Sequence, residues 1–465
     1  MCYDSGMEKD TLINSRHIDI LDGVRALSVI FVMIFHFWQQ TWIFPVVKTP
    51  FLSFIGIDKL DFTPIARVGY LFVDMMILIS GFLLFLPAAR NIVSGDPIEG
   101  CGRYFKKRAI RILPSYLFCI IVLFVYEVIG GGFGDPVEWR AALCDLFLHL
   151  TFMHTWTVNS YLGSKLSTVL WTLGVEVWFY ILFPVIASFI KRRQKENSTF
   201  FPIIRAGIIA AFMIILSLVY IYAYVLNSGS EFASFVDSFL LNIRIGDPAK
   251  PFISVGIRST YPAMVINQLP AFLGVYAVGM LGSIAYAFIS KYMKRRWWSG
   301  LISIVVSVLF IVVIWKMLKE CASLDPELAQ IWQVTRRLGL ALIFMGFILS
   351  TALASKPYRL FFSNKLMVFL STISYNLYIW HQWLCVKIKY DWRIPFWAGD
   401  KPPNQLNTPE AKIWSWKYAL IITAAAIIAA VLATYLIERP AADLLNGRKS
   451  IYNGKLKEGR KKTAG

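Results

Sequence analysis

The sequence carries few charged residues for its length. Asp, Glu, Lys and Arg make up 16% of the 465 residues, whereas hydrophobic residues make up 57%. A soluble domain typically has about 25% charged and about 45–50% apolar residues. The apolar residues fall in runs of roughly 18–25, the length that an α-helix needs to cross a hydrocarbon core about 30 Å thick. This composition excludes an ordinary soluble protein and predicts an all-α protein that spans a membrane several times.

Motifs for several kinds of metal and catalytic site are missing. The six cysteines form no CxxC pair and no Cys/His spacing that suits zinc. There is no GxSxG nucleophile motif, and the glycine-rich stretch 130–134 has no lysine after it to complete a phosphate-binding loop. We therefore predict no metal site and no tightly bound cofactor. Free thiols are expected, with a disulfide between Cys144 and Cys321 as the less favoured alternative.

Two further histidines are not expected to be ligands. His149 and His154 are five residues apart, so they do not share a face of one helix. We predict interfacial positions for both.

Basic residues outnumber acidic ones and give a net charge of +19. A domain that binds nucleic acid is not predicted, because the lysines and arginines lie between the apolar runs and do not form one basic region. Basic residues in the short loops of a membrane protein mark its cytosolic side. The basic loops follow alternate apolar runs, so all of them lie on one side if both termini are cytosolic.

We expect about ten membrane spans in a transmembrane domain over residues 1–440, followed by a basic cytosolic tail over 441–465. The predicted spans are 21–38, 68–88, 109–129, 170–190, 203–226, 264–289, 299–318, 335–353, 365–386 and 416–437. The segment 141–157 is also apolar, but an eleventh crossing would place the basic cluster at 191–195 outside. We therefore interpret 141–157 as a re-entrant or interfacial helix on the outer side.

Ionisable side chains inside the predicted spans are the strongest indication of function, because such groups are costly in a bilayer. The helical rise places four of them, from four different spans, at one depth of roughly 20–24 Å from the cytosolic face. These are His36, Asp74, Glu176 and His381. We expect them to form a polar chamber. Each also has a structural alternative, as a packed or hydrogen-bonded side chain, and this alternative is weakest for His36.

A second polar layer is predicted near the cytosolic face. Arg25 lies eleven residues before His36, nearly three helical turns, so both residues share a helix face. Arg108 and Arg111 are three residues apart and share a face as well. Because arginine binds phosphate by forked hydrogen bonds, we predict a phosphate-binding mouth there. The alternative for Arg108 and Arg111 is a role as cytosolic anchors of their span.

Six sequence blocks are spread over almost the whole chain. They are LDGVRALSVIFVMIFH (21–36), VDMMILISGFLL (73–84), FKKRAIRILPSY (105–116), LWTLGVEVWFYILFP (170–184), SYNLYIWHQ (374–382) and IERP (437–440). In this order they resemble the motifs of the acyltransferase-3 family of integral membrane O-acyltransferases. The matching positions include Arg25 and His36 in the first block and Glu176 in the fourth.

The resemblance implies a co-substrate and an acceptor. The donor is an acyl-CoA, usually acetyl-CoA, presented from the cytosol, and the acceptor is typically a hydroxyl of a cell-surface glycan. Arg25, Arg108 and Arg111 would bind the donor. The same motifs suggest supporting residues, which are Asp74, Tyr116, Trp171, Tyr378 and His381. The resemblance also implies a multi-pass protein of the plasma (inner) membrane, in contact with its lipids.

Two features depart from the family pattern. Many members have an arginine before their LPxFLxG motif, where this chain has Asn267 and Gln268 in NQLPAFLG (267–274). Many members also carry a C-terminal esterase-like domain, whereas this sequence ends shortly after IERP. We therefore expect it to resemble the members that stand alone and either modify their acceptor directly or supply a separate partner.

These observations predict a membrane-bound O-acyltransferase, most simply an O-acetyltransferase. His36 is expected to act as general base on the acceptor hydroxyl, or as a transient acyl carrier, because an imidazole titrates near neutral pH. Glu176 is expected to orient His36 or to hold its proton. The alternative from another class is a transporter or flippase that uses the same intramembrane charges.

Overall fold

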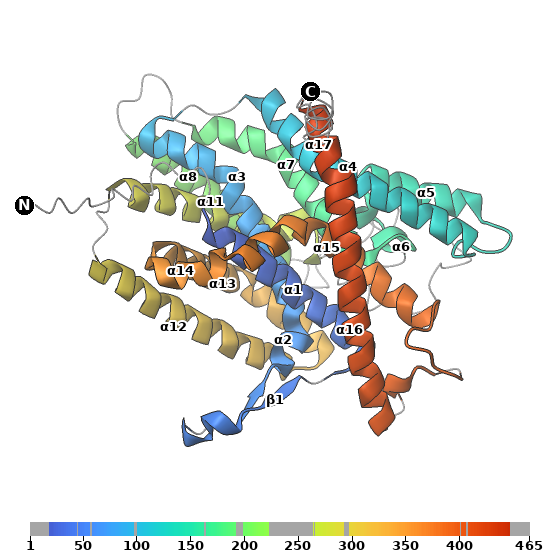
Figure 1. The fold of residues 1–465 in the computed structure, drawn as a ribbon. Helices are drawn as coiled ribbons and strands as arrows, with labels where there is room; N and C mark the ends of the chain where they lie inside the picture. Colours follow the sequence, from blue (N-terminus) through green and yellow to red (C-terminus); the bar gives the residue numbers. More distant parts are fainter. Residues whose placement is uncertain are drawn as a thin grey trace, which may run out of the picture.

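The computed structural model describes residues 18–446, except for 44, 56–57, 97–99, 162–163, 192–198, 223–263, 265, 293–296, 400 and 406–407. Long α-helices form a bundle (Figure 1). In the described ranges the only sheet is an antiparallel hairpin of β1 (Val46–Lys48) and β2 (Lys59–Asp61). The predicted all-α membrane fold is confirmed. Most of the predicted tail, 441–465, lies outside the described residues.

Within these ranges, nine helices are long and apolar enough to cross a membrane. They are Ile20–Thr41 (α1), Thr63–Ser94, Cys101–Ile129 (α4), Trp171–Ile190 (α7), Phe200–Ile221 (α8), Leu269–Tyr292 (α11), Trp298–Ala322, Leu328–Leu353 and Pro409–Leu445. Four of these spans differ in their bounds from the helices that form them. The span 63–94 contains α2 (Thr63–Val68) and α3 (Phe72–Ser94), and the span 409–445 contains α16 (Pro409–Leu432) and α17 (Arg439–Leu445). The other two lie in α12 (Trp297–Ala322) and α13 (Pro326–Leu353). Each span overlaps one of the ten predicted, so nine of those predictions are confirmed.

The remaining predicted span, 365–386, lies in α15 (Lys365–Tyr390), which is long enough to cross but less apolar than the other nine. Its polar residues Ser374, Asn376 and His381 are all buried. α15 packs between α1 and α16. A helix that is surrounded by protein can carry polar side chains, because they meet partners there and not lipid. The mean hydropathy of α15 is therefore a poor guide to whether this helix crosses the membrane.

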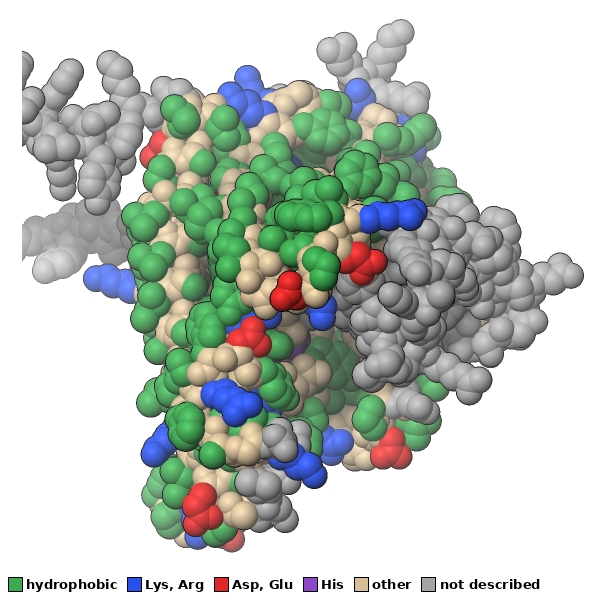
Figure 2. Space-filling view, turned by 90° about the vertical axis from the view of Figure 1, so that its right-hand side faces the viewer, with side chains coloured by type: hydrophobic (Ala, Val, Ile, Leu, Met, Phe, Trp, Pro, Cys, Tyr) green, Lys and Arg blue, Asp and Glu red, His purple; other side chains and the backbone are tan. Residues whose placement is uncertain are grey.

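The bundle has a buried centre and a lipid-like periphery. α3 packs along α11 in its interior, where Gly279 lies against the backbone of α3: a Cβ at this position would stand 2.8 Å from the Phe82 nitrogen. By contrast, α8 and α12 expose large apolar side chains, such as Phe212 and Leu309. Figure 1 shows α12 and α16 on the outside of the bundle. Figure 2 shows hydrophobic side chains over most of the described surface on one face, with charged side chains gathered around a hollow.

Contacts between helix ends define an inner end of the bundle. Lys291 of α11 donates from Nζ to the Val93 carbonyl of α3 at 2.6 Å. Arg205 of α8 donates from Nη2 to the carbonyl of Lys191, just after α7, at 2.9 Å. These residues border loops that the sequence predicts to be cytosolic. We call this end of the bundle the inner end and the opposite end the outer end.

The segment that follows α4 does not cross the bundle. α5 (Trp139–Leu150) has 12 residues, about 18 Å of helix, too short for a core about 30 Å thick. It runs alongside α4 (Figure 1), and the hydroxyl of Tyr116, near the middle of α4, donates to the His149 carbonyl at 2.8 Å. The chain then returns through η3 (His154–Trp156), α6 (Val158–Tyr161) and η4 (Thr168–Leu170). This course matches the re-entrant interpretation of 141–157.

The remaining described elements are short or peripheral: η1 (Pro50–Ile55), η2 (Gly69–Leu71), α14 (Lys356–Ser363), η6 (Pro403–Gln405) and the π-helical turn Ala433–Glu438. The five cysteines in the described ranges are free thiols. The alternative of a Cys144–Cys321 disulfide is therefore wrong.

A buried ion pair joins α3 to α13. The Arg337 Nε atom lies 3.5 Å from Asp74 Oδ2, and both side chains are almost fully buried. Arg337 also donates to the Ile266 carbonyl at 2.7 Å and to Asn267 Oδ1 at 3.4 Å. Asn267 in turn donates to the Tyr161 hydroxyl at 2.7 Å. Asp74, a predicted supporting residue, therefore positions Arg337, which holds the segment that leads into α11.

Removing one member of this pair should be worse than removing both. Asp74→Ala leaves a guanidinium buried without its counter-ion, which typically costs about 3–5 kcal/mol. The double variant Asp74→Ala/Arg337→Met has no unpaired charge and should regain much of the lost stability. Thermal unfolding of the purified protein in detergent measures the difference.

The adjacent residue supplies the control for this experiment. Arg336 pairs with Glu320 at 3.1 Å, and both side chains are about half exposed. Exposed pairs contribute about 0–1 kcal/mol, so Arg336→Ala should shift the melting temperature little. A double variant as unstable as Asp74→Ala alone would contradict the pairing.

Candidate active site

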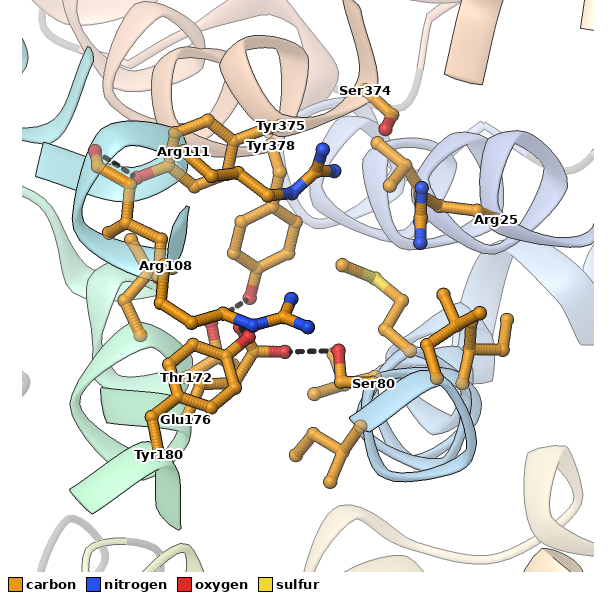
Figure 3. A pocket seen from close by; sticks show the side chains of 18 residues that line it. Arg25, Ser80, Arg108, Arg111, Thr172, Glu176, Tyr180, Ser374, Tyr375 and Tyr378 are labelled. Atoms are coloured by element: carbon orange, nitrogen blue, oxygen red, sulfur yellow. Dashed lines mark hydrogen bonds between the residues drawn. The ribbon is translucent and has the colours of Figure 1, made fainter. Parts of the chain in front are cut away.

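Three arginines line a small cavity toward the inner end. Its volume is about 100 Å³, and its polar lining includes Arg25 of α1, Arg108 and Arg111 of α4, and Glu176 of α7. Figure 3 shows the three guanidinium groups pointing toward the middle of this space. The same arginines line a second, wider cavity of about 490 Å³ at the inner end. The structure therefore brings the predicted arginine layer together where these two spaces meet. We call the narrow space of about 100 Å³ the inner cavity.

Aromatic rings hold one of these arginines in place. The guanidinium carbon of Arg108 lies 5.7 Å from the ring centroid of Tyr104 and 5.6 Å from that of Tyr180. Stacking of this kind stabilises a guanidinium while its N–H groups stay directed at a ligand. Arg108 Nε is buried without a hydrogen-bond acceptor among the described residues. The cavity thus offers donors that an anionic group can satisfy.

Glu176 belongs to the inner cavity and not to the histidine site. Its Oε1 accepts from Ser80 Oγ at 2.7 Å, and its Oε2 accepts from the Tyr180 hydroxyl at 3.2 Å. Neither oxygen is hydrogen-bonded to His36, although both residues are described. The expectation that Glu176 orients His36 is therefore wrong in this structure. Glu176 and His36 share a depth, but their helices direct them into different cavities.

His36 pairs instead with His381. His381 Nε2 lies 3.1 Å from His36 Nδ1. His381 Nδ1 lies 2.7 Å from the Tyr378 carbonyl oxygen, and His36 Nδ1 lies 3.0 Å from that of Val32. A carbonyl oxygen can only accept, so both Nδ1 atoms carry the proton when the rings are neutral. His381 Nε2 then accepts from His36, which leaves His36 Nε2 without a proton.

A larger cavity opens on the other side of His36. Its volume is about 550 Å³, and we call it the outer cavity. Aromatic rings and side-chain amides make up much of its lining. They are Phe35, Trp38, Tyr70, Tyr161, Trp171 and Tyr378 among the aromatic residues, and Gln39, Asn267, Gln330, Gln333 and Gln382 among the amides. The predicted supporting residues Trp171 and Tyr378 thus lie beside the predicted base.

Tyr378 and Val73 separate the two cavities, because both residues line each of them. The Tyr378 hydroxyl accepts from Thr172 Oγ1 at 3.1 Å and lies 3.3 Å from the Val169 carbonyl oxygen. These bonds fix α7, which begins at Trp171, against the middle of α15. The start of α7 therefore holds the Tyr378 hydroxyl between the inner cavity, which arginines line, and the outer cavity, which His36 lines.

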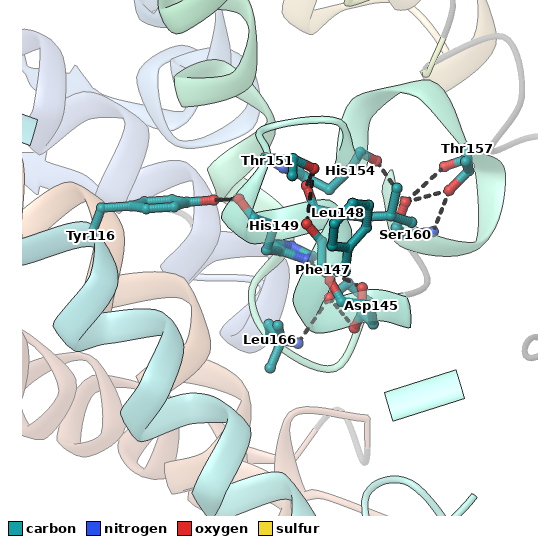
Figure 4. A network of polar contacts seen from close by, with 11 residues as sticks. Tyr116, Asp145, Phe147, Leu148, His149, Thr151, His154, Thr157, Ser160 and Leu166 are labelled. Carbon is teal, nitrogen blue, oxygen red and sulfur yellow. Dashed lines mark hydrogen bonds and ion pairs between the residues drawn. The ribbon is translucent and has the colours of Figure 1, made fainter. Parts of the chain in front are cut away.

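Tyr116 lies apart from both cavities. It stacks on Phe152, with ring centroids 4.6 Å apart, and its hydroxyl binds the end of α5. Figure 4 shows it at the edge of a polar network that includes His149 and His154. Those two histidines are buried and stacked 4.3 Å apart. Both histidines are thus enclosed by protein, and because α5 ends between them, the spacing rule for a single helix does not apply to this pair.

Arg337 is a site residue that the sequence reasoning missed. It lies close to the start of a predicted span, in TRRLGL, where it resembles an ordinary anchor. Its guanidinium carbon lies 4.1 Å from the ring centroid of Phe272. Together with its bond to Asn267, this places a cation beside the NQLPAFLG segment, where the family's own arginine is missing. An arginine inside an apolar helix was the available signal.

The described ranges contain no group of three or more His, Cys, Asp or Glu residues that could hold a metal ion. The polar groups that line these two cavities are arginines, one carboxylate, hydroxyls, amides, a thiol and the His36 imidazole. This set can bind an anionic group from the inner end and accept a proton in the outer cavity.

Comparison with known proteins agrees with this arrangement. The chain is 25% identical over 337 residues to ORF330 of Acidianus two-tailed virus, which carries an acetyltransferase name, covering 71% of this chain and 78% of that protein. It is 24% identical over 197 residues to the O-acetyltransferase OatA of Staphylococcus aureus, covering 41% of this chain and 28% of OatA. A second S. aureus protein with an O-acetyltransferase name is 22% identical over 380 residues, 79% of this chain and 50% of that protein.

The chain thus spans between about a quarter and half of the length of the two S. aureus relatives. No solved structure matches it. The family model for the acyltransferase domain Acyl_transf_3 matches residues 18–439, which is most of the chain. The protein is therefore a multi-pass membrane acyltransferase that belongs to the acyltransferase-3 family.

Proposed function

We propose that the protein transfers an acetyl group from cytosolic acetyl-CoA to a hydroxyl of a cell-surface glycan. The inner cavity would receive the donor, the outer cavity the acceptor, and His36 Nε2 would take the hydroxyl proton. The observation that carries the proposal is the contact of His36 Nδ1 with His381 Nε2 and the Val32 carbonyl, which leaves His36 Nε2 free to accept a proton, in a cavity that adjoins the arginine chamber. The plasma membrane is the site where such a donor and acceptor lie on opposite sides.

The inner cavity supports a phosphorylated donor. Arg25, Arg108 and Arg111 converge there (Figure 3) and reach the wider cavity at the inner end. Planar guanidinium groups bind phosphate oxygens in pairs. The narrow chamber beyond them has room for a thin arm and not for a nucleotide. An acyl-CoA, which joins a phosphorylated head to a long thin thioester arm, fits both parts.

The outer cavity supports a hydroxyl-rich acceptor. Tyr161, Trp171 and Tyr378 present ring surfaces, and Asn267 and Gln382 present amides. Amides can both donate to and accept from hydroxyl groups, while aromatic faces pack on the apolar faces of sugar rings. Pockets that combine apolar walls with a few placed polar groups bind small ligands. A glycan end is the acceptor that this lining favours.

The proposed step balances without a metal or a bound cofactor. The acceptor oxygen forms a bond to the thioester carbonyl carbon while its proton passes to His36 Nε2. The bond between carbon and sulfur then breaks, and the thiolate takes up the proton. The products are an O-acetyl ester and the free thiol of CoA. His381 supports this step, because its Nε2 accepts from His36 Nδ1 and so holds the ring in the tautomer whose Nε2 can take the proton.

A transporter or flippase remains the second class of function. It would use the intramembrane charges without breaking the thioester. Release of free CoA thiol by the purified protein, dependent on an added hydroxyl acceptor, distinguishes the two classes. The adjoining cavities favour transfer, because each one ends at Val73 and Tyr378 with different chemistry on its two sides.

Loss of the imidazole at position 36 should abolish transfer. His36→Ala removes the general base, and such groups contribute about 10²–10⁴-fold to the rate. The measurement is acceptor-dependent thiol release from acetyl-CoA, together with the melting temperature in detergent to show that the fold is intact. A folded His36→Ala protein that turns over at the wild-type rate would contradict the role of this residue.

Two substitutions at His381 form a matched pair for the same measurement. His381→Gln places an amide oxygen where His36 Nδ1 can donate, whereas His381→Leu offers no acceptor. A single hydrogen bond of about 1 kcal/mol corresponds to several-fold in rate, so kcat should fall further in the leucine variant, with the donor KM unchanged. Equal kcat values for the two variants would exclude a positioning role.

Removal of an inner arginine should weaken donor binding selectively. Arg111→Ala should raise the KM for acetyl-CoA about tenfold, because charge-assisted bonds to phosphate are among the stronger hydrogen bonds. With S-acetylpantetheine, which lacks the nucleotide phosphates, the same substitution should have little effect. Lys106→Ala is the control, since Lys106 is an exposed cation of α4 outside the inner cavity. Equal effects on the two donors would refute phosphate binding by Arg111.

A further inference from the structure

One charged side chain in the outer cavity has no role in the transfer step described above. Arg67, on α2 at the outer end of its span, lines this cavity together with His36. Among the described residues of the lining, it is the only one that carries a formal charge. Arg67 is half-buried among neutral side chains, and a buried or half-buried arginine is usually paired. Arg67 therefore calls for a partner.

The described residues supply no such partner. Neither a hydrogen bond nor an ion pair to a described residue satisfies the guanidinium of Arg67. By contrast, Arg337, a cation with a structural role, has a carboxylate partner, Asp74, 3.5 Å away. Arg67 instead lies over the ring of Trp38, with its guanidinium carbon 6.0 Å from the ring centroid.

This stacking leaves the guanidinium well placed to bind an anion. A ring face restrains the long side chain but satisfies none of its five N–H donors. Little additional side-chain freedom would be lost when an anion binds, which favours affinity. The neutral amides and aromatic rings around Arg67 neither compensate its charge nor repel an anionic ligand.

The position of Arg67 relates this cation to the reacting group. Trp38, on which Arg67 stacks, lies on α1 as His36 does, and all three residues line the same outer cavity of about 550 Å³. A molecule of one or two sugar rings can therefore contact both Arg67 and His36 at once. An acidic group on the acceptor would bind Arg67 while a neighbouring hydroxyl faces His36 Nε2.

We propose that the acceptor carries an anionic group, a carboxylate or a phosphate, and that Arg67 selects for it. This inference rests on the proposed acetyl transfer to a hydroxyl in the outer cavity. It narrows the acceptor from glycans in general to acidic ones. Neutral acceptors would react more slowly, because they leave the guanidinium in a partly desolvated cavity without an anion.

The test compares acceptors that differ by one acidic group. Methyl glucuronide is set against methyl glucoside, and glycerol 3-phosphate against glycerol, with thiol release from acetyl-CoA as the readout. The wild-type protein should show a higher kcat/KM for the acidic member of at least one pair, by about tenfold or more, as expected for a charge-assisted bond. Arg67→Gln should reduce this preference to near unity, and Arg67→Lys should retain part of it.

A second cation at the same end controls for the general surface potential. Lys319 is exposed on α12 and lies outside the cavity lining, so Lys319→Gln should leave the acid preference intact. The preference of the wild-type protein should also survive added salt better than a surface effect would, because the cavity is partly enclosed.

Three results would overturn the inference. They are a wild-type protein without acid preference in either pair, an Arg67→Gln variant with the wild-type preference, and a Lys319→Gln variant that loses the preference equally. Melting temperatures of all variants identify a substitution that acts through folding, and in that case Arg67→Lys decides. A wild-type protein that releases no thiol with any of these acceptors would instead refute the proposed transfer, and this inference with it.

Discussion

The hydrogen bond between His381 and His36 is the interaction on which the proposed chemistry of this protein depends. It joins α15 to α1, and together with two backbone carbonyls it assigns the protons of both rings. A basic nitrogen is thereby kept on the outer-cavity side of the bundle without a carboxylate beside it. Because a neutral imidazole is less costly to bury than an ion pair, the bundle can hold this base between α1 and α15 at the edge of the outer cavity.

The other buried charged residues fall into two groups, one paired within the protein and one that lines a cavity. Asp74 and Arg337 neutralise each other and fix the segment around Asn267, so they shape the outer cavity without acting in it. The inner arginines outnumber the carboxylates around them: Glu176 lines the narrow cavity, and Asp22, Glu438 and a further cation, Arg439, line the wider one. A surplus of positive charge at the inner mouth is what a phosphorylated donor requires. The structural role and the proposed binding role thus fall to different charged residues.

Helix positions could be predicted from the sequence, but helix rotation could not. The rise per residue placed His36, His381 and Glu176 at one level, and the two imidazoles do meet. Glu176 faces the other cavity, because depth says nothing about which way a helix is turned. The three-residue spacing of Arg108 and Arg111 was sufficient to predict that both face one cavity, since both lie on one helix. Arg337 was missed because its partner Asp74 comes from a distant part of the chain.

The central claim is that donor and acceptor approach one wall, formed by Val73 and Tyr378, from opposite ends of the bundle. A structure with a non-hydrolysable acetyl-CoA analogue bound tests it most directly. Our account predicts the phosphates within hydrogen-bonding distance of the inner arginines and the acyl carbonyl at Tyr378, within reach of His36 Nε2. A donor bound at the outer end, or one whose acyl group lies away from this wall, would contradict it.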